Sequence, residues 1–391
     1  MVIGIFGNNI TAKVAFLVLR ARGVECRLFG KLYSDDEALL HRSRFASRTM
    51  AISIDNLETL RCIMDCESLF EKSGVIERIL VLNGQDSKGH DVELRARDFG
   101  YDKMGYIIDY NGLCEEIDRA IDGKMVCDVR GIKRDGGGFI VERDGCSEGL
   151  DRIILTDGMY DDICDFDVSE GRVGYDYKEY GMTINVEHEF LHNNTAIEWF
   201  TRLGPLALLP MRDGKRSNIV RTIPSDLARD VMELEGDKRN EFILSYLTNL
   251  LSGYVGRIEI LGDVSIFPLC VGYGRQSKDD GICFIGTKSF IMHPIAGQGF
   301  NVILRDIERL AESICKSGGF SDFKGSLKRK IDVLSMLFMT HNLNQFFKIS
   351  NPIISGVRRL GMGIFNNIDF LKRACVNNAI GTGFFNGGKG V

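Results

Sequence analysis

Short apolar runs and helix-periodic segments alternate along this chain, and together they predict a mixed α/β protein. An apolar strand over residues 1–6 precedes a helical pattern that runs to about Arg22 and stops at Gly23. Near the other end, a strand at 282–285 leads through a Pro/Gly loop into a helical pattern over 302–314. A strand, a loop and a helix in this order direct backbone N–H groups and the positive end of the helix dipole at a ligand above the loop.

Segments of alternating polarity predict three antiparallel groups of strands. They are a meander over 125–131, 139–143 and 153–156, a hairpin of 79–83 with 92–97, and a hairpin of 183–190 with 195–200. Helical patterns follow over 226–235 and 237–251. From about Ser321 we expect helices that are rich in large apolar residues.

The composition narrows the classes of function. The 391 residues are enough for two lobes with cores of their own, and a net charge of −5 argues against a nucleic-acid partner. The eleven cysteines show neither a CxxC pair nor zinc-type spacing with histidine, so we expect reduced thiols and no metal site. With no charged leader and no apolar run of spanning length, we expect a cytoplasmic protein without a signal peptide.

The residues most suggestive of chemistry lie in the loop between 290 and 301. This loop contains His293, Pro294, Gly297, Gln298, Gly299 and Asn301. Two glycines that flank a glutamine let the backbone approach a flat or anionic ligand closely. The reduced edge of a flavin is such a ligand, although an ordinary glycine-rich turn remains the alternative.

This loop, followed by Leu304-Arg305-Asp306, resembles the third FAD motif of the aromatic-ring hydroxylases. It is most similar to the branch that hydroxylates polyprenylated rings in ubiquinone biosynthesis. A second block, residues 196–211 around the turn at Gly204-Pro205, resembles the same branch. The resemblance covers nearly the whole chain in order.

The resemblance implies an α/β fold with a Rossmann-like, three-layer FAD-binding domain that carries a β-meander. It also implies an interleaved substrate domain built on an antiparallel sheet, and C-terminal helices. The expected FAD-binding domain comprises 1–75, 98–168 and 278–320, the substrate domain 76–97 and 169–277, and the C-terminal helical segment 321–391.

The adenosine end of the implied FAD site departs from the family pattern. Gly7 and Ala12 match the first and third positions of the dinucleotide fingerprint, but Asn9 replaces the second glycine. Gly30 stands where an acid should hold the adenosine ribose. We therefore expect FAD to bind through Gly7, Asn9 and Ala12 with reduced affinity.

The remaining implied FAD contacts lie elsewhere in the chain. They are Arg48, Asp157, Gly158, Gly286, Thr287, Pro294, Gly297, Gln298, Gly299 and Asn301. Thr287 replaces the acid that binds the ribityl chain in many flavin hydroxylases. The only catalytic candidate is His293, as a proton relay, although a structural role is the simpler interpretation, as it is for His188 and His192.

The resemblance implies an FAD-dependent monooxygenase that hydroxylates a polyprenylated phenol with NAD(P)H and O2. The rivals are another FAD enzyme of the same fold and a degenerate homologue that binds lipid or scaffolds a quinone-biosynthesis complex. An apolar substrate also raises peripheral contact with the inner face of the cytoplasmic membrane. We place that contact between Leu334 and Phe370, near Arg358, Arg359, Lys372 and Arg373.

Overall fold

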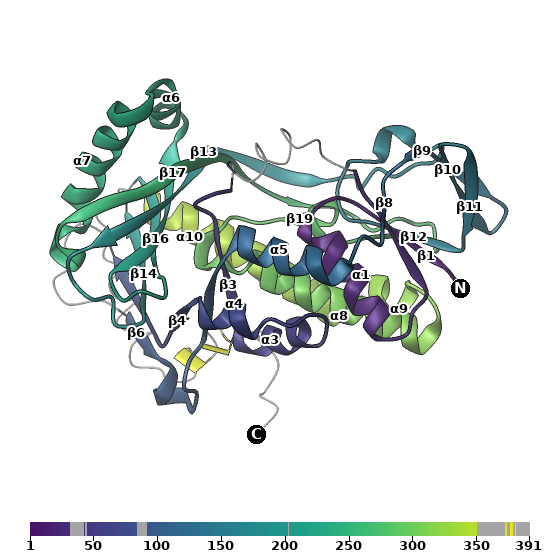
Figure 1. Ribbon diagram of the computed structural model, residues 1–391, viewed down its shortest axis with the longest axis horizontal. Helices are drawn as coiled ribbons and strands as arrows, with labels where there is room; N and C mark the ends of the chain where they lie inside the picture. Colours follow the sequence, from purple (N-terminus) through teal and green to yellow (C-terminus); the bar gives the residue numbers. More distant parts are fainter. Residues whose placement is uncertain are drawn as a thin grey trace.

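A computed structural model of the chain describes residues 1–31, 43, 45–83, 92–201, 203–349, 372, 373, 376, 377 and 380. The molecule is elongated and has two lobes (Figure 1). Two 16-residue antiparallel strands, β13 (Val173–His188) and β17 (Ile258–Tyr273), run from one lobe toward the other. The predicted mixed α/β class is confirmed.

The lobe that holds the N-terminus is built on a parallel five-stranded sheet in the order β18-β12-β1-β2-β8. Its strands are β1 (Ile3–Phe6), β2 (Cys26–Phe29), β8 (Met125–Val126), β12 (Arg152–Leu155) and β18 (Ile282–Phe284). Ile3 and Ile5 pack with the helices α1 (Ile10–Ala21), α5 (Tyr110–Ile121) and α8 (Gly299–Ser317). Because side chains alternate along a strand, Phe6 belongs to the core on the opposite face.

That opposite face carries the meander, which makes the third layer. It consists of β9 (Val129–Asp135), β10 (Gly138–Arg143) and β11 (Cys146–Leu150). The prediction that 153–156 form its third strand is wrong, because these residues lie in β12, parallel to β1. The missed signal is Asp144-Gly145, a turn in which Gly145 has φ +81° and which returns the chain as β11.

The second lobe is built on an eight-stranded sheet in the order β19-β17-β13-β16-β15-β14-β5-β6. The further strands are β5 (Arg78–Asn83), β6 (Val92–Arg95), β14 (Thr195–Thr201), β15 (Gly204–Pro210), β16 (Arg216–Pro224) and β19 (Phe290–Ile291). The helices α6 (Ser225–Glu233) and α7 (Gly236–Val255) pack on one face through an apolar core. The other face is turned toward the N-terminal lobe.

The predicted hairpin of 79–83 with 92–97 is confirmed as the β5–β6 pair. The predicted hairpin of 183–190 with 195–200 is wrong, because β13 pairs with β16 and β17 while β14 pairs with β15 and β5. Thr201 of β14 pairs with Gly204 of β15, so these two strands are antiparallel neighbours. Alternating polarity sets the face of a strand but not its neighbour, so this error could not be detected from the pattern alone.

A small antiparallel sheet connects the lobes. It contains β3 (Thr49–Ser53), β7 (Gly105–Asp109) and β4 (Gly74–Ile76), and it is flanked by α3 (Ile54–Arg61) and α4 (Glu67–Glu71). Short 3-10 turns lie at η1 (Ala96–Phe99), η2 (Asp161–Ile163), η3 (Gly286–Lys288) and η4 (Ile295–Gly297).

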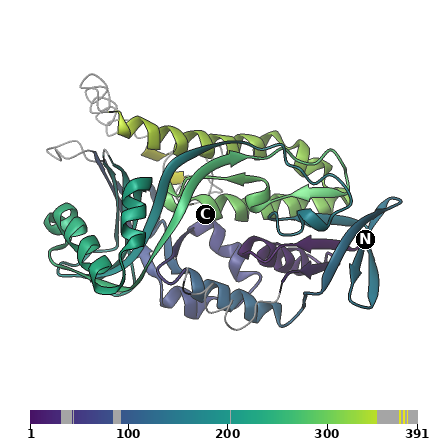
Figure 2. The ribbon, with the colours of Figure 1, turned by 90° about the horizontal axis from the view of Figure 1, so that it is seen from above.

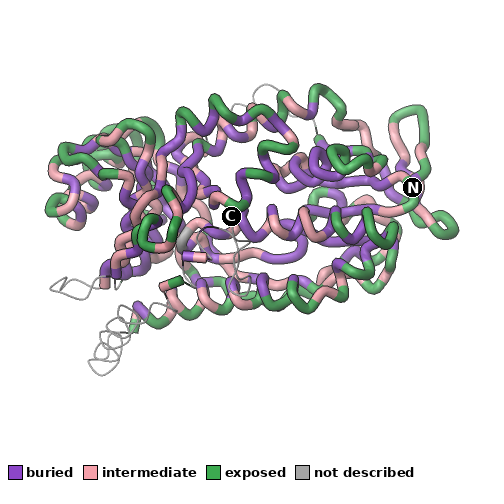
Figure 3. Tube along the Cα trace, turned by 90° about the horizontal axis from the view of Figure 1, so that it is seen from below, coloured by how far each residue is buried: buried purple, intermediate pink, exposed green. Residues whose placement is uncertain are grey.

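The C-terminal part of the described chain is helical, as expected. After α9 (Ser321–Gly325), the long helix α10 (Leu327–Lys348) runs along the length of the molecule (Figure 2). Val333, Met336 and Leu337 pack it against α8 and β19. Buried positions follow the sheets and the inner faces of the helices (Figure 3).

The described residues were expected to contain neither a membrane-spanning helix nor a metal site. None of the helices there is both long and apolar enough to cross a bilayer. Within the same residues, no three His, Cys, Asp or Glu side chains are grouped so that they could hold a metal ion.

Candidate functional site

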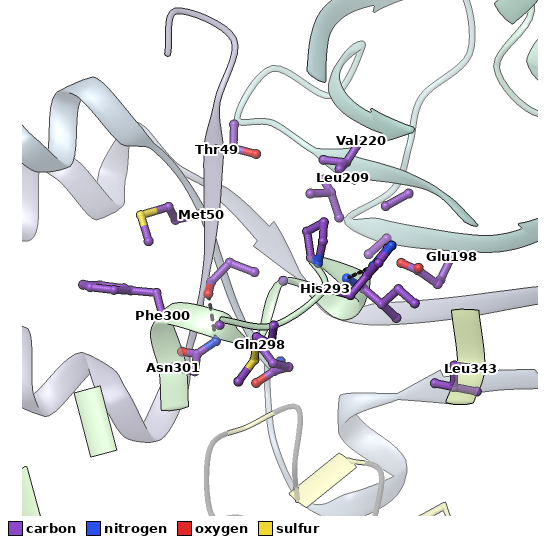
Figure 4. Close-up of a pocket in the computed structure, with 18 of the residues that line it drawn as sticks. Thr49, Met50, Glu198, Leu209, Val220, His293, Gln298, Phe300, Asn301 and Leu343 are labelled. Carbon is purple, nitrogen blue, oxygen red and sulfur yellow. Dashed lines mark hydrogen bonds between the residues drawn. The ribbon is translucent and has the colours of Figure 1, made fainter. Parts of the chain in front are cut away.

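A cavity of about 750 Å³ lies where the two lobes meet (Figure 4), and its volume is typical of small-molecule sites. Its walls come from β3, the uncovered face of the eight-stranded sheet, the loop after β19, and α10. Most of the lining side chains are apolar, among them Ile79, Val81, Ala196, Phe200, Ala207, Leu209, Val220, Leu269, Met339, Leu343, Phe346 and Phe347. Six residues of the expected FAD site also line it, namely Arg48, Pro294, Gly297, Gln298, Gly299 and Asn301, together with the catalytic candidate His293.

The loop between β19 and α8 forms one wall of the cavity. Gly297 has φ +60°, and a Cβ at this position would lie 2.9 Å from the Ala51 Cβ. Helix α8 begins at Gly299, and its first three residues all line the cavity. Since the first N–H groups of a helix have no partner within it, the positive end of the α8 dipole lies at the cavity wall.

Asn301 fixes this helix end to β3. Its amide oxygen accepts hydrogen bonds from the Ser53 backbone N–H at 3.0 Å and from Asn56 Nδ2 at 2.9 Å. Its own Nδ2 donates to the Ala51 carbonyl at 2.9 Å. The Asn301 side chain therefore holds the loop in place, although we expected it to contact the cofactor directly.

His293 is buried beside the same loop, and it is a neutral group. Its Nδ1 accepts a hydrogen bond from the Ile295 backbone N–H at 3.3 Å, which leaves the proton of the neutral ring on Nε2. That Nε2 is buried and has no hydrogen-bond partner. Burial, with nearby Lys348 and His341, lowers the pKa of His293 to about 3. The ring keeps an N–H without a hydrogen-bond partner among the described residues, but it cannot carry a proton as a cation at neutral pH.

Arg48 supplies a cation at the edge of the cavity. Its guanidinium lies 4.8 Å from the centre of the Tyr110 ring and 5.3 Å from that of Phe45. Contacts of this kind hold a cation without neutralising its charge. Arg48 is therefore available to an anionic or electron-rich ligand edge.

The expected adenosine contacts lie away from the cavity and are engaged with one another. Asn9 caps α1, since its amide oxygen accepts the Ala12 N–H at 3.0 Å. Its Nδ2 donates to an Asp157 carboxylate oxygen at 2.9 Å. Gly7 has φ +145°, and a Cβ there would lie 2.0 Å from Thr156 Oγ1. The Ala12 N–H, which the resemblance assigns to a pyrophosphate, therefore bonds Asn9 instead.

Other residues that we expected to contact FAD on this side also contact protein groups. Thr287 is exposed, and its hydroxyl donates to the Thr156 carbonyl at 3.2 Å. Gly286 has φ +60° and packs against Thr11, while Gly158 is exposed. Burial raises the pKa of Asp157.

Gly30 and Lys288 lie where the resemblance places the ribose and the ribityl chain, and protein side chains surround both residues. A Cβ at Gly30 would lie 2.4 Å from Met125 Sδ and 2.9 Å from Asn8 Oδ1, so no acid could be introduced there without displacing them. Lys288, which is 2 % exposed, bonds Asp161 and lies 3.2 Å from a Glu170 oxygen. This cation serves two protein carboxylates.

The residues therefore fit the two ends of an FAD molecule differently. The cavity end offers a helix dipole, a close-approach glycine loop and an arginine, which suit an isoalloxazine ring. At the adenosine end, the Asn9 side chain bonds the Ala12 N–H and Asp157, so the turn before α1 offers fewer free groups to a pyrophosphate.

Glu198 is a site residue that the sequence reasoning did not identify. It lies on β14 between Val81 and Ala207 of the neighbouring strands, and all three line the cavity. Glu198 is half-buried in the cavity wall, and burial raises the pKa of Glu198 to about 7. The available signal was a single ionisable residue inside the apolar run from Thr195 to Phe200.

His188 and His192 do not line the cavity. His188 is held by the Phe190 carbonyl and by Ser217, at 2.7 and 2.9 Å, and His192 by the Met211 carbonyl at 2.9 Å. Both rings have the structural role that we expected.

No family model matches the chain. Among curated proteins, the ubiquinone hydroxylase UbiL of Rhodospirillum rubrum is 30% identical over 214 residues, which is 53% of this chain and 49% of that protein. Other ubiquinone-biosynthesis hydroxylases match over similar shares. The chain thus spans about half the length of the curated relatives it matches.

Solved structures of similar fold cover nearly the whole chain. The p-nitrophenol 4-monooxygenase PnpA from Pseudomonas putida DLL-E4 superposes with a TM-score of 0.73 at 12% identity, over 100% of this chain and 98% of that one. Klebsiella pneumoniae HpxO in complex with FAD and uric acid gives a TM-score of 0.70 at 11% identity, over 97% of each chain. At such identities the likeness shows the fold alone. By sequence, then, this chain is a relative of the ubiquinone-biosynthesis hydroxylases, and its fold is that of the FAD-dependent monooxygenases.

Proposed function

We propose that the chain is a flavin-dependent hydroxylase of a polyprenylated phenol in ubiquinone biosynthesis, which uses FAD, NAD(P)H and O2. The observation that carries this proposal is that one cavity contains both a loop suited to a flavin ring and an apolar space beside that loop. The loop from Pro294 to Gly299, with the positive end of α8, supports a flavin ring. The adjoining apolar walls leave space for an aromatic substrate beside it.

The chain's own residues have defined tasks in such a reaction. The backbone from Gly297 to Gly299 and the α8 N-terminus stabilise negative charge on a reduced ring edge. The apolar walls would exclude water from the reacting groups. The chemistry that FAD supplies when bound is the acceptance of electrons from NAD(P)H and the activation of O2.

An apolar tail on the substrate is consistent with the outer part of the cavity. Leu343, Phe346 and Phe347 of α10 line it, and Phe346 is also exposed at the surface. A long isoprenoid chain gains free energy from leaving water along such a surface. The names of UbiL and of the Dictyostelium discoideum monooxygenase COQ6 refer to ubiquinone, which supports a polyprenylated ring as the substrate class.

The proposal is tested with the purified protein. We expect the absorption spectrum of bound flavin, and consumption of O2 and NADH or NADPH that depends on an added prenylated phenol. Formation of a product with one more oxygen atom, measured by mass spectrometry, would complete the test. A protein that carries flavin but oxidises NAD(P)H without altering any phenol would contradict it.

A second candidate function is supported by the internal hydrogen bonds of the expected adenosine contacts. A homologue without FAD could bind a prenylated ring in the same cavity and act as a lipid-binding or scaffold subunit of a quinone-biosynthesis complex. This candidate predicts a colourless protein that gains no flavin when FAD is added, yet still binds a prenylated phenol. The same spectrum therefore distinguishes the two functions.

Replacing Asn9 with glycine should tighten FAD binding. The substitution frees the Ala12 N–H and removes the side chain that occupies the turn before α1. Glycine at a helix N-cap costs only a few tenths of a kcal/mol relative to asparagine, and the Asp157 carboxylate that loses its Asn9 bond is only half-buried, so the fold should persist. Titration calorimetry with FAD measures the gain. Riboflavin, which has no phosphate, is the control ligand, and an equal change for both ligands would contradict the assignment of this turn to the pyrophosphate.

We further propose that α10 docks on an anionic bilayer surface, from which the substrate would enter. An exposed apolar stripe runs along the helix through Leu327, Ile331, Leu334 and Phe338, with Leu327 69% and Phe338 72% exposed. The exposed Lys328 and Lys330 lie beside this stripe. Apolar insertion together with lysines at an anionic surface gives reversible attachment.

The residues named for this role from the sequence are placed only in part. Arg358 and Arg359 lie outside the described residues. Lys372 and Arg373 are described, and the Arg373 guanidinium lies 5.8 Å from the centre of the Phe99 ring. The docking surface that we propose is accordingly the stripe on α10.

Co-sedimentation with anionic liposomes tests the docking. Replacing Lys328 and Lys330 with glutamine should weaken binding, because each lysine near such a surface contributes about 1 kcal/mol. Replacing the exposed Lys215 and Lys238, which lie on other elements, is the matched control for net charge. Binding that is equal in both double variants, or absent in the unaltered protein at low salt, would refute the proposed surface.

A further inference from the structure

Glu198 is out of place in the wall that carries it. It belongs to a row that crosses five adjacent strands at one level, from Val81 through Glu198, Ala207 and Val220 to Thr183. All five residues line the cavity, and Glu198 alone can ionise. A carboxyl group enclosed by apolar neighbours costs free energy unless something bonds to it.

No such bond comes from the described protein. The pKa of Glu198 is raised to about 7 by burial alone, with no cation or hydrogen-bond donor to offset it. The rest of β14 explains the direction of the side chain. Trp199 packs in the core beneath α6 and α7, while Ala196 and Phe200 line the cavity, so Glu198, which lies between them on the same face of the strand, points into the cavity.

The ionisable groups near Glu198 do not form a hydrogen bond or an ion pair with its carboxyl group among the described residues. Arg48 and Cys270 also line the cavity, and neutral His293 contributes a free Nε2–H. Figure 4 shows the Glu198 carboxyl group turned toward the loop that carries His293.

The charged and polar groups behind His293 are already engaged. Tyr177 Oη bonds His341 Nδ1 at 2.9 Å, and Lys348 pairs with Glu179 at 2.5 Å. Among the described residues, these groups are therefore not partners of the Glu198 carboxyl group.

We propose that Glu198 is the catalytic group that binds the hydroxyl of a phenolic ligand in this cavity and accepts its proton. The O–H bond of the phenol breaks as a bond forms between that proton and a carboxylate oxygen of Glu198, and the electron pair stays on the phenolate oxygen. A phenolate ring is more electron-rich than a phenol, which favours attack by an electrophilic oxygen. This inference deepens the proposed function and rests on it only for the reaction that follows proton transfer.

Proton transfer can be measured without turnover by using 4-nitrophenol, whose phenolate absorbs visible light. With the unaltered protein, bound probe should show the phenolate spectrum near neutral pH. With Glu198→Gln, the carboxylate is lost while size and polarity are kept, and the apolar wall disfavours a phenolate. The titration of the bound probe should therefore move upward by about one pH unit or more, which is a tenfold or larger change in proton affinity.

The matched control is Glu259→Gln, which removes an exposed carboxylate on β17 of the same sheet. It should leave the titration of the probe unchanged. Identical titrations in the unaltered protein and in Glu198→Gln would overturn the proposal, as would failure of the unaltered protein to bind the probe at any pH. Because the measurement needs neither FAD nor NAD(P)H, a colourless protein that still ionises the probe would refute the hydroxylase function and leave this assignment intact.

Discussion

Substituting valine for Gly299 should abolish the retention of bound flavin while the protein stays folded. Gly299 begins α8 and lines the cavity. A Cβ built there meets only Met292, at 3.6 Å to Cγ and 3.9 Å to Sδ, which is ordinary contact. The added side chain therefore takes space from a ligand rather than from the core. Flavin absorbance of the purified variant, together with its thermal unfolding midpoint, measures the two effects separately.

The matched control for this substitution is Gly253→Val. Gly253 is an exposed helical glycine on α7 with nothing within 4 Å of an added Cβ, so it has the same helix-propensity change without the cavity. Gly297 would be a poor test, since its positive φ and the Ala51 contact would strain the fold itself. A Gly299→Val protein that purifies with its full complement of flavin would exclude this loop as the flavin site.

The strand, loop and helix around residues 282–314 could be predicted because each carries a local signal. The apolar run forms β18, the periodic segment forms most of α8, and the Pro/Gly loop lies between them. Gly297 occupies a positive φ, which is the reason that this position suits a glycine. Patterns of this kind depend on residues close in sequence, so they predict an element without knowledge of the tertiary structure.

The errors concern choices that local pattern leaves open. The alternation over 195–200 was sufficient to predict a strand, but whether it paired with β13 or β15 depended on the turn at Thr201–Gly204. The same alternation placed Glu198 on one of two faces. Only the packing of Trp199 under α6 and α7 decides that its face is the cavity.

Asn9 shows a different limit. The sequence correctly marked it as a departure from the dinucleotide fingerprint. Its side chain, however, is engaged by residues about 150 positions away, since it bonds both Asp157 and Thr156. An asparagine side chain without such bonds could have rotated away to make room for a phosphate. One that caps α1 and holds a half-buried carboxylate has a structural task, and that could be learned only from the fold.

Replacing Arg329 with methionine should destabilise the protein by about 3–5 kcal/mol, because the buried Asp306 carboxylate loses its hydrogen-bonded cation and keeps only the looser pairing with Arg309 at 3.9 Å among the described residues. Arg329 is 1% exposed and Asp306 is 0% exposed. Arg329 donates to Asp306 through Nε, at 3.1 and 3.0 Å to the two carboxylate oxygens, and through Nη2 at 2.7 Å. The pair joins α8 to α10, so its loss also loosens the helix that begins at the proposed flavin loop. Urea unfolding of both proteins measures the difference.

The pH dependence of this variant separates an unpaired charge from lost packing. Without its arginine, Asp306 has a pKa in the folded state above that in the unfolded chain, since burial disfavours its charge. The destabilisation should then be fully present above the folded-state pKa and fade as the pH falls toward the unfolded-state value. Arg229→Met, which breaks an exposed pair with Asp226 on α6, should cost no more than about 1 kcal/mol at any pH. Equal losses in the two variants, or a loss in Arg329→Met that does not change with pH, would mean that the buried pair does not contribute in the way its geometry indicates.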